Sequence, residues 1–235
     1  MIFIVGLIMS TIRYLGLTRY APPLNMSIDQ LLFDRMPETG RDGTLRFFTF
    51  NTACISIGMN QKIDELPDVL SDSGLEIIKR PTGGGAVLHD GDLCYSVIMP
   101  ESYLPAGGSL MESYRSITEG LRRGFGLLGI ALEYGRDHAH RRDPLCFAGT
   151  LSYELSFNGR KIIGGAQRRA KGFLLQQGSV MPFHHVPHGQ LIAALLEGLR
   201  SSLNLDCVPL PLQADELEQA RRSAEKFMVR PRADR

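Results

Sequence analysis

Three consecutive glycines, Gly83, Gly84 and Gly85, lie in the stretch RPTGGGAVLHD, residues 80–90. Glycine weakens strands and loses much backbone entropy on ordering, so it marks positions of positive φ or of close approach to the backbone. The spacing is neither that of a P-loop nor GxGxxG, so neither phosphate-binding interpretation applies directly. Two interpretations stay open: a tight turn, or a loop whose missing side chains leave a slot for a ligand, with Arg80 at its edge.

The hydrophobic periodicity predicts interleaved helices and strands. Helical spacing of apolar residues predicts helices over 24–36, 110–128 and 190–203. Alternating or apolar runs predict strands over 12–17, 44–50, 54–59, 75–80 and 173–180. We also expect a short helix in the charged segment that follows residue 211.

Two hairpins are predicted. The stretch 86–100 is expected to turn at Asp90-Gly91-Asp92. The stretch 151–169 is expected to turn at Asn158-Gly159, because both central residues of the common two-residue turn need a positive φ. The pattern as a whole predicts an α/β (α+β) fold in which a mixed, largely antiparallel sheet is flanked by helices.

Length and charge limit the organisation and the partners. The chain has 235 residues, 43% of them hydrophobic, and no repeat or linker divides it, so we expect one domain over 1–235. The opening MIFIVGLIMS has no basic flank or cleavage site and is shorter than a membrane span of about 20 residues. Residues 1–8 are expected to be a loose tail or to precede the true start at Met9. A net charge of +1 gives no reason to expect a nucleic acid or a membrane as partner.

Four cysteines, Cys54, Cys94, Cys146 and Cys207, show no CxxC pair and no metal-ligand spacing. This usage is typical of a reducing compartment, so a cytoplasmic location is expected. Cys146 differs from the others because it follows a basic loop, residues 136–142. Cationic surroundings lower a thiol pKa and produce a nucleophile, although an inert structural cysteine fits the sequence equally well.

Other polar side chains have both an ordinary and a functional interpretation. Lys161 follows the turn at Gly159, where a strand would hold its ammonium group, but a lone lysine beside a turn is more often a solvated charge. His138 and His140, and the cluster at residues 184–188, lack an HExxH pattern or a carboxylate partner. We therefore expect no metal site.

Three separated motifs, RPTGGGAVLHD, GRKIIGGAQRR and QQGSV, occur in the order found in the biotin/lipoate protein ligase superfamily. The segments NMSIDQLL and SIGMNQ add to this resemblance, which extends from about Arg13 to about Arg200 and implies the catalytic-domain fold of that superfamily. Within it, CFAGTLSYELSFNGRK is similar to octanoyl-[acyl carrier protein]:protein N-octanoyltransferases, in which a catalytic cysteine of a Cys-Phe pair precedes a Gly-Arg-Lys lysine.

The resemblance implies roles for individual residues. Cys146 and Lys161 would be catalytic, with the octanoyl group carried as a Cys146 thioester. The acyl group would be bound by Arg80, Gly83, Gly84, Gly85, Ala86, Val87, His89, Gly164, Gly165, Ala166, Gln177 and Gly178. No cofactor would be needed. The partners would be octanoyl-acyl carrier protein and a lipoyl-domain protein or glycine cleavage H protein.

Two alternatives remain. The Gly-Gly-Gly run is the ligase form of the motif, Gln177 replaces the usual histidine, and GGAQ replaces Gly-Ser-Ala-Gln. An ATP-dependent lipoate-protein ligase, with ATP and magnesium as cofactors, would form a lipoyl-adenylate. No separate C-terminal domain would fit after about residue 205, so a ligase would need its accessory domain on a second polypeptide. The second alternative is a non-catalytic lipoyl- or biotin-binding regulator.

Overall fold

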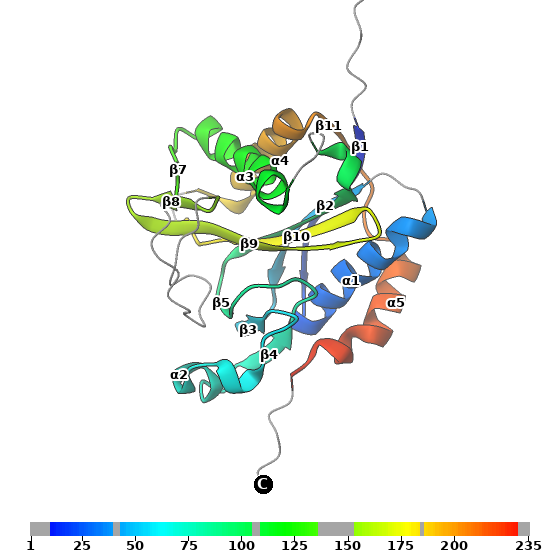
Figure 1. Ribbon diagram of the computed structural model, residues 1–235, viewed down its shortest axis with the longest axis vertical. Helices are drawn as coiled ribbons and strands as arrows, with labels where there is room; N and C mark the ends of the chain where they lie inside the picture. Colours follow the sequence, from blue (N-terminus) through cyan, green and yellow to red (C-terminus); the bar gives the residue numbers. More distant parts are fainter. Residues whose placement is uncertain (1–9, 40–42, 105–108, 136–152, 184–185, 230–235) are drawn as a thin grey trace, which may run out of the picture.

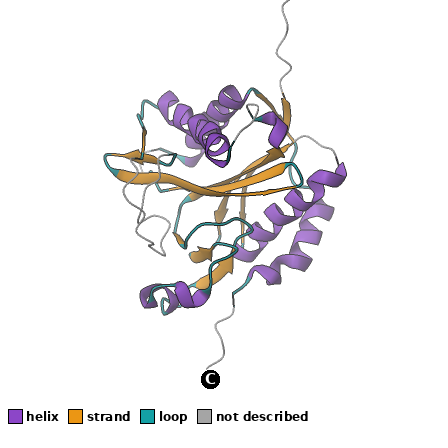
Figure 2. Ribbon diagram, viewed as in Figure 1, coloured by secondary structure: helices purple, strands orange, loops and turns teal. Residues whose placement is uncertain are grey.

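The computed structural model describes residues 10–39, 43–104, 109–135, 153–183 and 186–229, so the predicted tail at 1–8 lies outside the described residues. Figures 1 and 2 show two sheets with helices around them. The strands are β1 (Ser10–Tyr20), β2 (Gly43–Phe50), β3 (Cys54–Ile57), β4 (Glu76–Lys79), β5 (Val87–His89), β6 (Leu93–Pro100), β7 (Glu133–Tyr134), β8 (Leu155–Phe157), β9 (Arg160–Ala170), β10 (Phe173–Val180) and β11 (Leu205–Pro209). The α-helices are α1 (Pro22–Thr39), α2 (Asp68–Ser71), α3 (Leu110–Leu127), α4 (His188–Leu203) and α5 (Ala214–Ser223), with short 3-10 turns η1 (Ile63–Glu65), η2 (Glu101–Tyr103) and η3 (Ala224–Phe227).

The eight-stranded sheet has the order β11-β1-β2-β6-β10-β9-β8-β7, and a three-stranded sheet has the order β4-β3-β5. Within the large sheet, β1 pairs in parallel with β11 and with β2, and the remaining neighbours are antiparallel. The expected mixed, largely antiparallel sheet is therefore confirmed.

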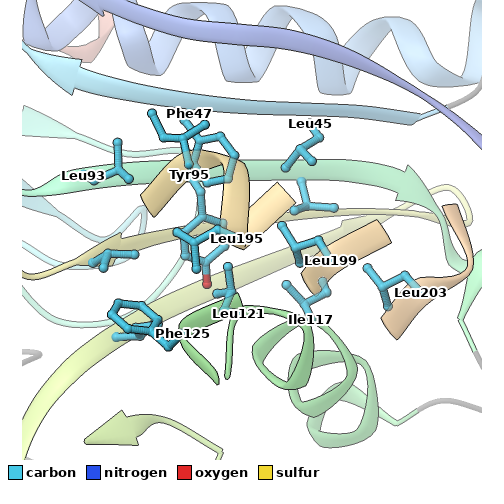
Figure 3. Packing of buried hydrophobic residues seen from close by; sticks show 14 of the residues in the cluster. Leu45, Phe47, Leu93, Tyr95, Ile117, Leu121, Phe125, Leu195, Leu199 and Leu203 are labelled. Atoms are coloured by element: carbon cyan, nitrogen blue, oxygen red, sulfur yellow. The ribbon is translucent and has the colours of Figure 1, made fainter. Parts of the chain in front are cut away.

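The helices cover the two faces of the large sheet separately, as Figure 1 shows. Successive side chains of a strand point to opposite faces. Tyr95 of β6 accordingly packs among Leu121 of α3 and Leu195 of α4 (Figure 3), whereas Ile98 of the same strand packs with Ile28 of α1. The second face, which carries α1, also faces the small sheet.

Helices α3 and α4 approach closely at three glycines. A Cβ on Gly198 of α4 would lie 2.2 Å from the carbonyl oxygen of Gly120 and 2.4 Å from the amide nitrogen of Gly124, both in α3. These distances are far below van der Waals contact, so the two helices could not keep this separation with alanine at position 198. Gly120 and Gly124, within the predicted helix over 110–128, thus serve helix packing.

The prediction of a hairpin over 86–100 is wrong. The chain does reverse there, with φ of +78° at Gly91, but β5 pairs with β3 in the small sheet. Both edges of β6 are already paired, one with β2 and the other with β10. The segment therefore connects two sheets. The second predicted hairpin is confirmed: β8 and β9 pair, and Asn158 and Gly159 both have positive φ.

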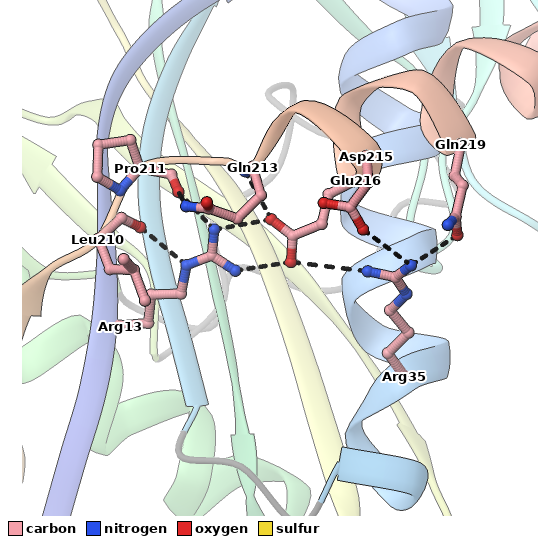
Figure 4. A network of polar contacts seen from close by, with 8 residues as sticks. All are labelled: Arg13, Arg35, Leu210, Pro211, Gln213, Asp215, Glu216 and Gln219. Carbon is pink, nitrogen blue, oxygen red and sulfur yellow. Dashed lines mark hydrogen bonds and ion pairs between the residues drawn. The ribbon is translucent and has the colours of Figure 1, made fainter.

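The C-terminal segment returns to the start of the described chain. Strand β11 pairs with β1, and the carboxylate of Glu216 in α5 accepts two hydrogen bonds from the guanidinium of Arg13 in β1, at 2.8 and 2.7 Å (Figure 4). Arg35 of α1 lies 3.7 Å from the same carboxylate. This buried carboxylate therefore joins α5 to β1 and α1.

Among the described helices, none combines the length and the apolar character that a membrane span requires.

Candidate active site

A mostly apolar pocket lies between the two sheets. It encloses about 430 Å³ including its open mouth. Its apolar wall is formed by Met26 of α1, Phe48 and Phe50 of β2, and Val87 of β5. This mostly apolar lining is that of a site for a small apolar ligand or an acyl chain.

Arg80 fixes the glycine loop, residues 82–85, at this pocket. One guanidinium nitrogen, Nη2, donates to the carbonyl oxygen of Gly83 at 2.6 Å and to that of Gly85 at 2.7 Å. The other, Nη1, donates to the carbonyl oxygen of Ser56 at 3.0 Å. Arg80 is buried and lines the pocket, so it connects the loop to strand β3.

Gly84 needs to be glycine for two reasons. Its φ is +86°, a conformation that residues with a side chain rarely adopt, and an added Cβ would lie 2.9 Å from Nη2 of Arg80. Its carbonyl oxygen also lies where a Cβ on Gly58 would be, at 2.1 Å. Gly83 differs, because an added Cβ there would meet no atom within 4 Å. The loop is thus both a tight turn and a close contact with β3.

A second set of contacts fixes the loop from the large sheet. Thr82 donates to Oε1 of Gln177 at 2.9 Å, and Nε2 of Gln177 donates to Asp29 at 2.6 Å. The same carboxylate forms a 2.7 Å ion pair with Arg46, and both of these side chains are buried. A buried charge needs such a partner. The pair orients Gln177, which lines the pocket from β10.

Lys161 is buried in strand β9, with its Nζ 2.8 Å from Oε2 of Glu154. The backbone places Lys161 opposite Ser156 of β8, two residues after the turn at Gly159. A side chain in this position is not a solvated surface charge. The ordinary interpretation of Lys161 is therefore wrong, and its ammonium group is held inside the protein by a carboxylate.

Cys146, the predicted nucleophile, lies outside the described residues. The other three cysteines have raised thiol pKa values. Burial is the main cause at Cys54 and Cys94, where the charge of Asp92 adds to it, and burial raises the pKa of Cys207 to about 11. At neutral pH these three are thiols, as expected for inert cysteines.

Eight of the predicted substrate-binding residues line the pocket: Arg80, Val87, His89, Gly164, Gly165, Ala166, Gln177 and Gly178. The other four, Gly83, Gly84, Gly85 and Ala86, are not among the described residues that line it. The three glycines form the loop bound by Arg80, and Ala86 is buried among Ile55, Ile57 and Ile77. Ala86 therefore contributes to hydrophobic packing of the small sheet.

Gly165 and Gly178 also have a packing reason that the sequence did not reveal. An added Cβ on Gly178 would lie 2.3 Å from the ring of Tyr95, and one on Gly165 would lie 2.8 Å from the hydroxyl of Tyr114. Both tyrosines belong to the α3–α4 side of the sheet, where Tyr95 and Tyr114 are buried. The two glycines make room on that side and offer bare backbone to the pocket on the other.

Several residues of the site were missed from the sequence. Ser56 of β3 and Asp92 lie next to His89, at 2.8 and 2.7 Å, but were taken as parts of a strand and of a turn. Glu154, the partner of Lys161, carries no motif. The alternation of Ser56 with two isoleucines could have indicated a polar inward position, but no local signal points to Glu154.

His89, Asp92 and Cys94 are the one group in the described ranges whose ligand atoms lie close enough to share a metal ion, all within 4.8 Å. Asp92 already accepts hydrogen bonds from His89 and from Ser179. The Cys94 thiol donates to the same carboxylate, with Sγ 3.4 Å from Oδ2. The chemistry of this group is that of a hydrogen-bond network.

Comparison with known proteins gives consistent matches. Residues 21–183 match the family described as the lipoyl protein ligase A/B catalytic domain. The octanoyltransferase LipM of Staphylococcus epidermidis is 30% identical over 253 residues, which covers 88% of this chain and 92% of that protein. The octanoyltransferase LipM of Geobacillus kaustophilus is 39% identical over 173 residues, covering 69% and 62% of the two chains.

The solved structures give the fold. A crystal structure of lipoate-protein ligase A bound with ATP superposes with a TM-score of 0.75 at 21% identity, covering 92% of this chain and 95% of that one. A bipartite lipoate protein ligase from Thermoplasma acidophilum gives a TM-score of 0.70 at 20% identity, with 93% of each chain covered. The predicted ligase catalytic-domain fold is confirmed.

Proposed function

Because the chain belongs to the lipoyl protein ligase A/B catalytic-domain family, we propose that it is an octanoyltransferase of protein lipoylation. It takes the octanoyl group from acyl carrier protein and passes it to a lysine of a lipoyl domain or of glycine cleavage H protein. The single observation that carries the proposal is the apolar pocket, which Gly164 of strand β9 lines. Lys161 is buried in the same strand three residues earlier and is not among the described residues that line the pocket. Three residues of strand span roughly 10 Å.

The pocket suits the acyl chain. Its lining is mostly apolar, and each methylene removed from water contributes about 0.8 kcal/mol. Arg80, bound to the glycine loop, and the backbone of Gly164 and Gly165 in β9 add polar groups to this lining. An octanoyl group buried here would leave its thioester head toward the Lys161 end of β9.

Cys146 is the nucleophile in this proposal. Its thiolate attacks the carbonyl carbon of the octanoyl thioester, the bond from that carbon to the carrier sulfur breaks, and the carrier leaves as a thiolate. A neutral lysine amine of the acceptor then attacks the Cys146 thioester and loses a proton, and Cys146 departs with its electron pair. Each step exchanges one acyl bond for another, so no nucleotide is consumed.

Lys161 supplies positive charge in both steps. Its ammonium group favours the thiolate of Cys146 and the oxyanion that develops on the carbonyl. Glu154 fixes the ammonium group at 2.8 Å, so that the charge is in place before the acyl group arrives. We therefore propose Cys146 and Lys161 as the catalytic pair, with no cofactor.

The alternative is an ATP-dependent ligase, for which the likeness to an ATP-bound ligase is the favouring observation. Two reactions separate the two functions. In one, the protein receives octanoyl-acyl carrier protein and a lipoyl domain without nucleotide; in the other, it receives free octanoate, ATP and magnesium. We expect octanoyl-lysine in the first reaction only. Product in the second reaction alone would establish the ligase instead.

A further inference from the structure

A chain of buried hydrogen bonds runs from Asp92 to Arg80 beside the pocket. Oδ2 of Asp92 lies 2.7 Å from Nδ1 of His89, and Nε2 of His89 lies 2.8 Å from Oγ of Ser56. The same Oγ lies 3.1 Å from Nη1 of Arg80. All four side chains are buried. The chain crosses the small sheet from β5 to β3, so it connects an anion and a cation that do not touch.

The donor and acceptor of each hydrogen bond follow from the two residues at the ends of this chain, Arg80 and Asp92. Arg80 can only donate, so the Ser56 hydroxyl oxygen accepts from it. An ionised Asp92 can only accept, so Nδ1 of His89 donates, and in the neutral imidazole Nε2 is left to accept the hydrogen of Ser56. Every donor therefore points from Arg80 toward Asp92.

We propose that Ser56, His89 and Asp92 are positioning residues, which fix the guanidinium of Arg80 and thereby set the glycine loop for acyl binding. This inference rests on the proposed octanoyl transfer. The remaining N–H groups of Arg80 donate to two carbonyl groups of the glycine loop, so any turn of the guanidinium plane displaces that loop. His89 is further held against the ring of Phe50, at 4.7 Å between centroids.

The arrangement resembles a Ser-His-Asp triad in its connectivity but not in its accessibility. Ser56 lines the pocket but is only 1% exposed, and its oxygen already accepts from Arg80. A nucleophilic serine needs a free line of approach to a carbonyl carbon. We therefore expect Ser56 to bind Arg80 and not to carry an acyl group.

The test compares Ser56→Ala, His89→Leu and His89→Gln with the full-length parent. Thr118→Val serves as the control, because it removes a buried hydroxyl hydrogen bond of α3 away from the pocket. Steady-state transfer is measured against octanoyl-acyl carrier protein concentration. We expect KM to rise roughly tenfold in His89→Leu and kcat to stay within about twofold. In Ser56→Ala the rise in KM should be smaller, because Arg80 keeps its hydrogen bond to the backbone carbonyl of residue 56. Gln can donate and accept, so His89→Gln should recover part of the loss.

A KM within about twofold of the parent in Ser56→Ala and in a folded His89→Leu would overturn the inference. Labelling of Ser56 by a fluorophosphonate would also overturn it. Hydrogen exchange of the peptide over 80–86 gives a second readout that needs no turnover: it should accelerate in Ser56→Ala and not in Thr118→Val. Unchanged exchange contradicts the positioning role, whereas an inactive parent with accelerated exchange in the variant contradicts only the octanoyl transfer.

Discussion

Nζ of Lys161 lies 2.8 Å from Oε2 of Glu154, and both side chains are buried. A buried ion pair loses much of its hydration, and removing one partner leaves the other charge uncompensated. The ion pair therefore holds the ammonium group of Lys161 in one buried position beside strand β9. If Lys161 stabilises a thiolate and an oxyanion, its rate effect depends on this anchoring.

Lys161→Ala should slow octanoyl transfer by roughly 10²–10³, because one well-placed charge near an oxyanion contributes about 2–4 kcal/mol. Glu154→Gln should slow it by roughly tenfold, since the ammonium group keeps its charge but loses an ionic partner. Lys161→Arg should recover little, because the guanidinium is planar and bulkier. Single-turnover transfer from octanoyl-acyl carrier protein measures these rates.

A double variant separates this effect from stability. Lys161→Met with Glu154→Leu removes both charges, so it should melt closer to the parent than Lys161→Ala does while staying as slow. Lys226→Ala, an exposed lysine of η3, is the matched control and should transfer at the parent rate. Parent-like turnover in Lys161→Ala would exclude a role in the chemistry.

Gly84→Val should destroy acyl loading. A β-branched residue at φ of +86° costs about 1–2 kcal/mol or more, and its Cβ would displace Nη2 of Arg80. Gly83→Ala meets nothing within 4 Å and should melt with the parent, which makes it the control for the fold. Intact-mass spectrometry after exposure to octanoyl-acyl carrier protein measures loading. A fully loaded Gly84→Val would mean that the glycine loop has no influence on the acyl group.

Gly198→Ala should destabilise the protein by about 1–3 kcal/mol or more, because its Cβ would overlap backbone atoms of α3. Gly126→Ala, in the same pair of helices, has open space and should leave stability unchanged or raise it slightly. Urea denaturation of the two variants beside the parent measures the difference. Equal midpoints would show that α3 and α4 can separate without loss.

The local patterns were the ones that could be predicted from the sequence. The turn at Asn158-Gly159 formed as expected because its conformation depends on two adjacent residues. Helix α3 followed its apolar periodicity. Gly120 and Gly124 of that helix could not be interpreted from the sequence, because the residues that require them to be glycine belong to α4, about 75 positions later in the chain.

Long-range pairing accounts for most of what was missed. Strand β11 lies beside β1 although 195 positions separate Ser10 from its partner Leu205. The segment through Asp92 has the pattern of a hairpin, yet its two strands belong to different sheets. At the site, the motifs marked Arg80 and Lys161, but their partners Ser56 and Glu154 follow only from register and packing.

The ion pair between Arg13 and Glu216 predicts a loss of stability in acid. Burial alone would raise the pKa of Glu216, but hydrogen bonds from Arg13 and from the backbone at Gln213 lower it below its usual value. A carboxyl with a lowered pKa stabilises the fold above its unfolded pKa, and that contribution is lost as the pH falls through the folded pKa.

Glu216→Gln should therefore lower the unfolding free energy by about 1.5–3 kcal/mol at pH 7, and the gap to the parent should close as the pH falls below about 4.5. Urea midpoints at pH 7, 5 and 4 measure this gap. Glu218→Gln, which removes an exposed ion pair of the same helix, is the control and should change stability little. A gap that stays constant with pH would contradict the role of the Glu216 charge.

In the proposed reaction, Cys146 carries the octanoyl group as a thioester. The most direct measurement is the intact mass of the protein after mixing with octanoyl-acyl carrier protein, without nucleotide. We predict one added octanoyl group that hydroxylamine removes, that is absent in Cys146→Ala, and that a lipoyl domain discharges onto one lysine. In the parent, iodoacetamide at neutral pH should modify Cys146 before Cys54, Cys94 or Cys207, whose thiol pKa values are raised. No adduct, together with full activity of Cys146→Ala that depends on ATP and magnesium, would contradict the account.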